Sequence, residues 1–279
     1  MRPRPSFPAK FSGTGHRPAG ATKTERNGAG GSENRGSPTI AARNRIAPVT
    51  QASSSPSGGS PLGADSGALR RNMVRKLSGQ GLADPLVMSA MATVERHRFV
   101  DSALRGQAYE DTSLPIGLGQ TISKPGVVAR MIELLRNGSA GRLGRILEVG
   151  TGCGYQAAVL SLLADEVYSI ERLRGLHEKA RDNLRHLRLA NVHLLFGDGM
   201  AGFAKGAPYA GIIAAAGGDA VPPAWTDQLA VGGRLVAPVS LGGGASRQQA
   251  LLVIDKTAKG LHQTVFEPVH FVPLKSGVA

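Results

Sequence analysis

The chain has 279 residues, of which 41% are hydrophobic, and its formal net charge is +13. This length and composition support a full hydrophobic core. No apolar run reaches the roughly 18 residues that span a bilayer, and no signal-peptide hydrophobic region follows the basic start, so we expect a cytoplasmic protein without membrane contact. The one cysteine, Cys153, excludes an internal disulfide, and none of the seven histidines forms an i, i+4 pair, so we expect no metal.

Residues 1–69 form a basic extension that is rich in Gly, Ser and Pro. The extension contains two aromatic residues, Phe7 and Phe11, and no sustained helical or strand period. It cannot bury enough apolar surface to offset the entropy of ordering, so we expect it to be disordered. Its 9 basic and 3 acidic side chains carry +6 of the net charge. A solvated tail is the simplest interpretation, while a weak nucleic-acid contact, an organellar transit peptide and a true start at Met73 stay open.

Residues 73–279 have the pattern of a single α/β domain. Helices are expected first, with Asp84 as the N-cap ahead of Pro85. The turn-rich segment 108–125 is too irregular for a helix and too long for an idle connector. From residue 145 strands and helices alternate, which is typical of a doubly wound, mostly parallel sheet. We expect helices at 73–80, 84–96, 125–136, 154–164, 172–188, 199–204 and 222–230, strands at 145–149, 167–171, 192–196, 210–215 and 233–239, and two edge strands at 250–256 and 265–274.

Three glycines at alternate positions follow the first of these strands. Gly150, Gly152 and Gly154 allow backbone conformations closed to other residues, and they let a ligand approach the main chain without meeting a Cβ. The spacing is one residue shorter than the Gly-x-Gly-x-x-Gly that holds a dinucleotide pyrophosphate. The turn therefore favours a nucleoside cofactor without phosphates.

Acidic residues stand at the ends of three successive predicted strands, where open α/β sheets bind their ligands. Glu148 ends the first strand and Glu171 the second, and Asp198 follows the third next to Gly199. Glu171 lies about 21 residues beyond Gly150, the distance at which an acid reaches both ribose hydroxyls. Asp198 can accept from an adenine amino group. Each acid alone could instead cap a helix, but three at successive strand ends favour a cofactor site.

These residues resemble a known family. The ordered motifs at 147–158, 169–172, 197–199 and 232–238 look like those of the Rossmann-like (class I) S-adenosylmethionine-dependent methyltransferases. More narrowly, segment 108–125 is similar to the substrate-side segment of the protein-L-isoaspartate O-methyltransferases. The likeness runs from about Met73 to Leu274. It implies methyl transfer from S-adenosylmethionine to the free carboxylate of L-isoaspartyl residues in damaged proteins and peptides, which starts their repair.

The chemistry implied by the resemblance agrees with the predicted lack of a metal. A carboxylate with a pKa near 4 is already ionised at neutral pH, so its attack on a sulfonium methyl group needs no general base. Catalysis is then mainly alignment in a site that excludes water.

The resemblance also assigns roles to residues. It places the active-site serine at Ser123, whose hydroxyl would orient the incoming carboxylate, with Thr121 and Ile122 beside it on the substrate side. Capping of the helix that starts at Pro125 is the alternative role for Ser123. The expected cofactor-binding residues are Glu148, Gly150, Gly152, Cys153, Gly154, Glu171, Asp198 and Gly199.

Two positions depart from the family pattern. Cys153 stands where a serine or another small residue is usual, which makes the site a candidate for attack by thiol reagents. Ala210 and Gly211 stand where an aspartate commonly starts the fourth strand, so that edge of the site is expected to differ.

Other hypotheses remain open at this point. A nicotinamide-dependent oxidoreductase explains the glycine turn but gives residues 108–125 no role. A Rossmann-like methyltransferase that acts on nucleic acid or another substrate is suggested by the sequence pI of about 10.6. A non-catalytic cofactor-binding module is argued against by the intact acids and glycines. We expect a monomer.

Overall fold

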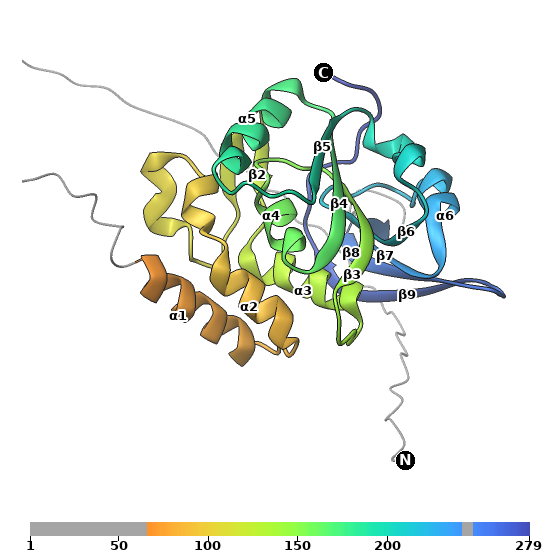
Figure 1. Ribbon diagram of the computed structural model, residues 1–279, viewed down its shortest axis with the longest axis horizontal. Coiled ribbons are helices and arrows are strands. Elements are labelled where there is room, and N and C mark those ends of the chain that lie inside the picture. Colours follow the sequence, from red (N-terminus) through yellow and green to blue (C-terminus); the bar gives the residue numbers. More distant parts are fainter. Residues whose placement is uncertain (1–65, 242–247) are drawn as a thin grey trace, which may run out of the picture. The chain divides into compact units, whose positions relative to one another are not determined.

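The computed structural model describes residues 66–241 and 248–279. All of them belong to one compact unit, Ser57–Ala279, which Figure 1 shows as a central sheet with helices packed against it. The part of the expected extension before residue 66 lies outside the described residues. None of the described helices is both long enough and apolar enough to cross a membrane.

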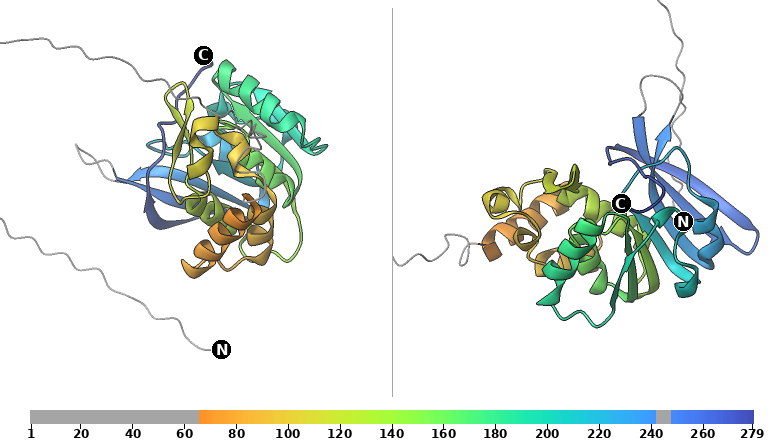
Figure 2. Two further views of the ribbon diagram at one scale, coloured as in Figure 1. Left: turned by 90° about the vertical axis from the view of Figure 1, so that its left-hand side faces the viewer. Right: turned by 90° about the horizontal axis from the view of Figure 1, so that it is seen from above.

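The central sheet has seven strands in the order β5-β4-β3-β6-β7-β8-β9. Its first five strands are mutually parallel, and β8 is antiparallel to both neighbours. The predicted doubly wound, mostly parallel Rossmann-like sheet is confirmed, and Figure 2 shows β8 and β9 (blue) continuing it at one edge. The strands are β3 (Leu143–Val149), β4 (Ala164–Glu171), β5 (Val192–Phe196), β6 (Tyr209–Ala214), β7 (Leu229–Leu241), β8 (Gln248–Thr257) and β9 (Gly260–Val269).

Two hydrophobic clusters cover the two faces of this sheet. Neighbouring residues of β3 point to opposite faces, so Ile146 enters one cluster and Leu147 the other, and both are fully buried. Helices α1 to α5 cover the first face, and Trp225 of α6 packs into the second. The helices are α1 (Ser66–Gly79), α2 (Pro85–Thr93), α3 (Pro125–Arg136), α4 (Tyr155–Ser161), α5 (Arg174–Arg185) and α6 (Pro223–Gln228).

The folded domain begins earlier than the predicted residue 73. Helix α1 begins at Ser66, so residues 66–69 are helical rather than part of a disordered extension. Arg70 explains why this turn is ordered, since its Nε donates to the carbonyl of Ala92 and its guanidinium contacts Glu95.

The structure also corrects the helices predicted at 84–96 and 199–204. The N-cap prediction for Asp84 is confirmed, because its carboxylate accepts from two backbone amides of α2. That helix stops at Thr93, where Val94 is extended, and the chain continues as a 3₁₀ turn, η1 (Arg96–Phe99). The helix expected at 199–204 is instead two 3₁₀ turns, η3 (Gly199–Ala201) and η4 (Ala204–Gly206), because Gly202 between them has φ 63°.

The segment 108–125 contains a feature that periodicity did not predict. It folds into a small antiparallel hairpin of β1 (Leu114–Gly117) and β2 (Gln120–Ile122), separate from the main sheet. A 3₁₀ turn, η2 (Ser102–Gln107), precedes it. The hairpin leads directly into α3, so it holds the residues before that helix near the carboxyl ends of the parallel strands.

The last predicted edge strand is displaced along the chain. Strand β9 spans Gly260–Val269 rather than 265–274. Residues 270–279, which we term the C-terminal segment, leave the sheet edge. Pro273 in this segment forms an isolated parallel bridge with Gly217, which follows β6.

Candidate active site

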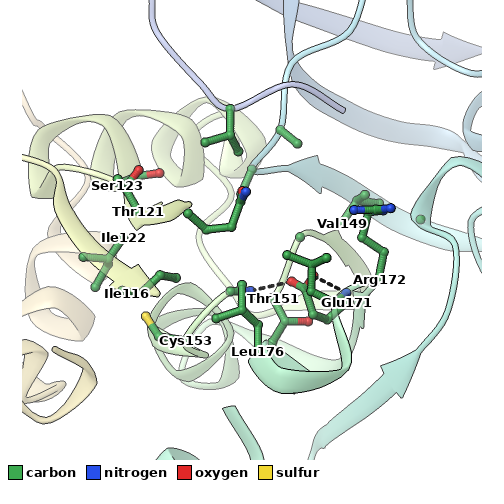
Figure 3. A pocket seen from close by; sticks show the side chains of 18 of the residues that line it. Ile116, Thr121, Ile122, Ser123, Val149, Thr151, Cys153, Glu171, Arg172 and Leu176 are labelled. Carbon is green, nitrogen blue, oxygen red and sulfur yellow. Dashed lines mark hydrogen bonds between the residues drawn. The ribbon is translucent and has the colours of Figure 1, made fainter. Parts of the chain in front are cut away.

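A cavity of about 400 Å³ lies at the carboxyl ends of β3 and β4. That is the size of a site for a cofactor-sized ligand. Its walls include four parts of the chain that are far apart in sequence: the β1–β2 hairpin, the glycine turn after β3, the end of β4 and the C-terminal segment. Figure 3 shows Ser123 and Thr121 on one side of this cavity, with Glu171 and Arg172 on the other.

The glycine turn has the conformation that its sequence predicts. Gly150, Gly152 and Gly154 have φ values of 92°, 56° and 90°, a region that side chains rarely adopt. Gly150 and Gly152 line the cavity, so a ligand can approach their main chain. Gly154 does not line it. A Cβ there would stand 3.0 Å from Cδ1 of Leu184, so this glycine allows close packing of the turn against α5.

Glu171 ties the glycine turn to the start of α5. Its Oε2 accepts from the amide of Gly152 and its Oε1 from the amide of Leu173, both at 2.9 Å. The residue is 5% exposed and lines the cavity. Each carboxylate oxygen keeps a further lone pair, so Glu171 can still accept from hydroxyl groups of a ligand.

Glu148 lies behind the cavity wall and is completely buried. The hydroxyl of Ser169 donates to its Oε2, and its Oε1 has no partner among the described residues. Burial raises the pKa of Glu148 to about 8, so the carboxyl group is mostly protonated at neutral pH. Ser169 also bonds Thr151, with 2.6 Å between the hydroxyl oxygens. Thr151 lines the cavity, so the hydroxyl groups of Ser169 and Thr151 connect the buried Glu148 to the site.

Asp198 follows β5 as predicted but does not line the cavity. Its Oδ1 accepts from the amide of Met200 at 2.9 Å, which caps η3, and its Oδ2 accepts from the amide of Gly277 at 2.7 Å. Gly199 does line the cavity, and a Cβ there would meet Val149 at 2.5 Å. The carboxylate expected to bind adenine is therefore bonded by the C-terminal segment in this structure.

Cys153 lies in the cavity wall, and its thiol is buried. The residue is 3% exposed, and burial raises the pKa of its thiol to about 11. Since the thiolate is the nucleophile, burial of the thiol works against the expected attack by thiol reagents. The backbone carbonyl of Cys153 accepts from the side-chain amide of Asn183, which fixes the turn to α5.

The predicted substrate-side residues Thr121, Ile122 and Ser123 all line the cavity. Ile122 is buried, Thr121 is exposed, and Ser123 lies between these extremes. The N-cap of α3 is Lys124, whose side chain makes no capping bond, and the carboxylate of Asp111 accepts from the first-turn amide of Gly126 at 2.6 Å. The capping alternative for Ser123 is therefore wrong, and its hydroxyl can bond a ligand.

Several cavity residues were missed by reasoning from sequence. The C-terminal segment is held across the strand ends: Val272 and Leu274 pair with the backbone of Gly217, and Arg172 bonds the carbonyl of Gly277. Reasoning from sequence had assigned residues 270–274 to an edge strand, so it missed these contacts. Gln156 also lines the cavity, is 7% exposed, and has a side-chain nitrogen with no partner among the described residues.

Within the described residues, no three His, Cys, Asp or Glu side chains gather as a metal site. The absence of a metal from the reaction stays a prediction.

The parallel sheet, the glycine turn and the strand-end acids define a Rossmann-like class I methyltransferase. The family model described as protein-L-isoaspartate(D-aspartate) O-methyltransferase matches residues 68–279. The chain belongs to this family. The match confirms the resemblance seen in the sequence, and it favours the isoaspartyl hypothesis over an oxidoreductase or a nucleic-acid methyltransferase.

Relatives of known name agree with the family match. The chain is 58% identical over 218 residues to a protein-L-isoaspartate O-methyltransferase of Methylibium petroleiphilum, covering 77% of this chain and 80% of the relative. It is 57% identical to the enzyme of that name from Leptothrix cholodnii over 220 residues, which are 78% and 77% of the two chains.

Solved structures agree as well. A structure named protein-L-isoaspartate O-methyltransferase has 29% identity and a TM-score of 0.67, over 75% of this chain and 67% of that one. A Plasmodium falciparum structure in complex with S-adenosyl-L-homocysteine has 24% identity and a TM-score of 0.61, over 74% and 98%. The second likeness concerns the fold alone.

Proposed function

We propose that this chain performs the family's reaction in the cavity described above, transferring a methyl group from S-adenosylmethionine to the free carboxylate of L-isoaspartyl residues in damaged proteins and peptides. The observation that carries the proposal is the division of one cavity into two sides. The glycine turn and Glu171 form one side, and Ser123 stands on the other. In the methyl ester the backbone amide nitrogen can attack the ester carbonyl and expel methanol, which closes the residue to a succinimide. Hydrolysis of the succinimide by water then returns part of the population to normal aspartate.

The glycine side fits a nucleoside cofactor. Gly150, Gly152 and Gly199 each present bare backbone to the cavity, in places where a Cβ would be strained or would clash. Glu171 would accept from the ribose hydroxyls, and Asp198 would accept from the adenine amino group once its contact with Gly277 is exchanged. When bound, S-adenosylmethionine supplies an electrophilic methyl group on a sulfonium.

The other predicted cofactor residues support this side rather than contact the ligand through polar groups. Cys153 contributes a small apolar part of the wall, and Gly154 sets the packing of the turn. Glu148 orients Thr151 through the hydroxyl of Ser169. We propose these roles because Glu148 and Gly154 do not line the cavity and the thiol of Cys153 is buried.

On the substrate side, Ser123 donates a hydrogen bond to the isoaspartyl carboxylate and directs one oxygen toward the methyl group. That carboxylate is ionised at neutral pH, so no residue has to remove a proton. Thr121 shapes the exposed rim, and Ile122 anchors the hairpin in the core. Alignment of oxygen and methyl in a site with little water is then the main source of rate.

The proposal is tested by transfer of tritiated methyl groups from labelled S-adenosylmethionine to a peptide with one isoaspartyl residue. The label should appear as methanol after base treatment, because carboxyl methyl esters are base-labile. The matched control is the same peptide with a normal aspartyl residue. Equal counts from both peptides would reject isoaspartyl methylation.

Further properties belong to the proposal. We propose a cytoplasmic monomer whose residues 66–279 act as one methyltransferase domain. The exposed large hydrophobic residues support a monomer because they belong to several different elements. Nucleic acid would bind weakly, through the basic extension alone. Deletion of residues 1–65, which leaves α1 intact, should remove any nucleic-acid affinity and leave peptide methylation unchanged.

A further inference from the structure

The tip of the β1–β2 hairpin has an unusual backbone. Gly117, Leu118 and Gly119 have φ values of 98°, 52° and 69° in succession. Glycine adopts this region at no cost, whereas a leucine there is an outlier. The other described residues besides glycine with positive φ are Asn137 and Arg188. Asparagine tolerates the conformation, so Leu118 stands in a position where folding alone favours a different residue.

The side chain of Leu118 is as unusual as its backbone. It is 62% exposed, yet it lines the active-site cavity. Its Cδ1 lies 3.1 Å from the point that a Cβ on Gly175 would occupy, so the leucine packs on bare backbone in the first turn of α5. Leu173 and Leu176 of the same region also line the cavity. Leu118 thus reaches from the substrate-side hairpin to the cofactor side.

The hairpin is fastened in this place by a charged side chain. Lys179 of α5 donates to the carbonyl of Ile116 at 2.9 Å and to Asp101 at 3.0 Å. Ile116 itself is 2% exposed and lines the cavity. The tip is therefore held over the cavity by a specific contact.

We propose that the side chain of Leu118 contacts the bound cofactor, covers its nucleoside and keeps water from the reacting sulfonium. The inference rests on the proposed function and deepens it. An exposed leucine in an unfavourable backbone conformation gains little in the ligand-free chain. It gains when a ligand in the cavity buries its apolar surface. Strain that is retained beside a ligand site and offset when the ligand binds is a known feature of functional loops.

The test compares Leu118→Asn with Arg188→Asn. The second variant places asparagine at another exposed position with positive φ (48°), which follows the C-terminus of α5 and does not line the active-site cavity. Both variants should be at least as stable as the parent chain in thermal melts, because asparagine accepts this conformation. Calorimetry with S-adenosyl-L-homocysteine should show about tenfold weaker binding for Leu118→Asn and no change for Arg188→Asn. Leu118→Met, which restores an apolar side chain of similar size, should recover the binding.

Normal binding of S-adenosyl-L-homocysteine by Leu118→Asn would overturn the proposal. The proposal would also be overturned if Leu118→Asn lowered both stability and binding and Leu118→Met restored neither, because Leu118 would then serve the folded structure and not the ligand. These outcomes are separate from failure of the proposed function, which would appear as a parent chain that does not methylate the isoaspartyl peptide.

Discussion

The buried acid behind the glycine turn makes a quantitative prediction about stability and pH. Burial raises the pKa of Glu148 from 4.5 to about 8. The folded chain therefore holds a proton that the unfolded chain releases between these two values. Because the folded state binds more protons in that window, its stability falls as the pH rises from about 4.5 to about 8 and is then constant. Substitution by glutamine removes this dependence.

The size of the effect follows from the shift. At 1.36 kcal/mol per pKa unit, the full penalty above the folded-state pKa is about 5 kcal/mol, and about 3 kcal/mol of it is present at pH 7. Glu148→Gln keeps an oxygen for the hydroxyl of Ser169 but cannot ionise. The free energy of unfolding of the variant should therefore rise relative to that of the parent chain by about 3 kcal/mol from pH 5 to pH 8. Any effect of the substitution that does not depend on pH adds equally at both values.

Urea unfolding at pH 5 and pH 8, without cofactor, measures this difference. The matched control is Glu166→Gln, because the pKa of the half-exposed Glu166 is lowered by its hydrogen bond with Arg145. A lowered pKa gives stability that is present at high pH and lost on acidification through the folded-state pKa, so the control changes in the opposite direction and by little. If Glu148→Gln differs from the parent chain by the same amount at both pH values, the reasoning about burial is refuted.

Three further predictions concern the same site. Gly154→Ala should lower the free energy of unfolding by about 1–3 kcal/mol, since its Cβ would stand 3.0 Å from a leucine of α5. The control is Gly138→Ala, because Gly138 also has positive φ (75°) but has open space around a Cβ. Equal losses of stability in urea for the two variants would contradict the packing argument. Cys153 should react with iodoacetamide at pH 8 at least about a hundredfold more slowly in the folded chain than in urea, because its pKa is about 11 rather than 9.0; similar rates would contradict the assigned burial. Asp198→Ala should weaken cofactor binding in calorimetry more than Ser123→Ala, whereas Ser123→Ala should mainly lower kcat, and reversed effects would exchange their roles.

The local parts of the site could be predicted from the sequence. The glycine turn and Glu171 belong to one β3–α4–β4 unit, whose pattern places both at the same edge of the sheet. The bond between the amide of Gly152 and Glu171 shows that they are neighbours there. The substrate-side serine was found through the family resemblance alone. That this hydroxyl does not cap α3 could not be foreseen, because it depends on where the helix cap falls.

The parts that could not be predicted depend on contacts between distant residues. The bond between Asp198 and Gly277 joins positions that no periodicity relates. The same holds for the path from Glu148 through Ser169 to Thr151, in which two hydroxyl groups that look like ordinary strand and turn residues connect a buried acid to the cavity. In both cases the local pattern predicts the location of the carboxylate but not what it bonds.

A crystal structure of the chain with S-adenosyl-L-homocysteine and an isoaspartyl peptide tests the central claim most directly. The account predicts the ribose hydroxyls at Glu171, the nucleoside against the backbone of Gly150 and Gly152, and the peptide carboxylate within hydrogen-bond distance of Ser123 on the opposite side of the same cavity. A nucleoside bound elsewhere, or a peptide carboxylate remote from Ser123 with the cavity filled, would contradict it.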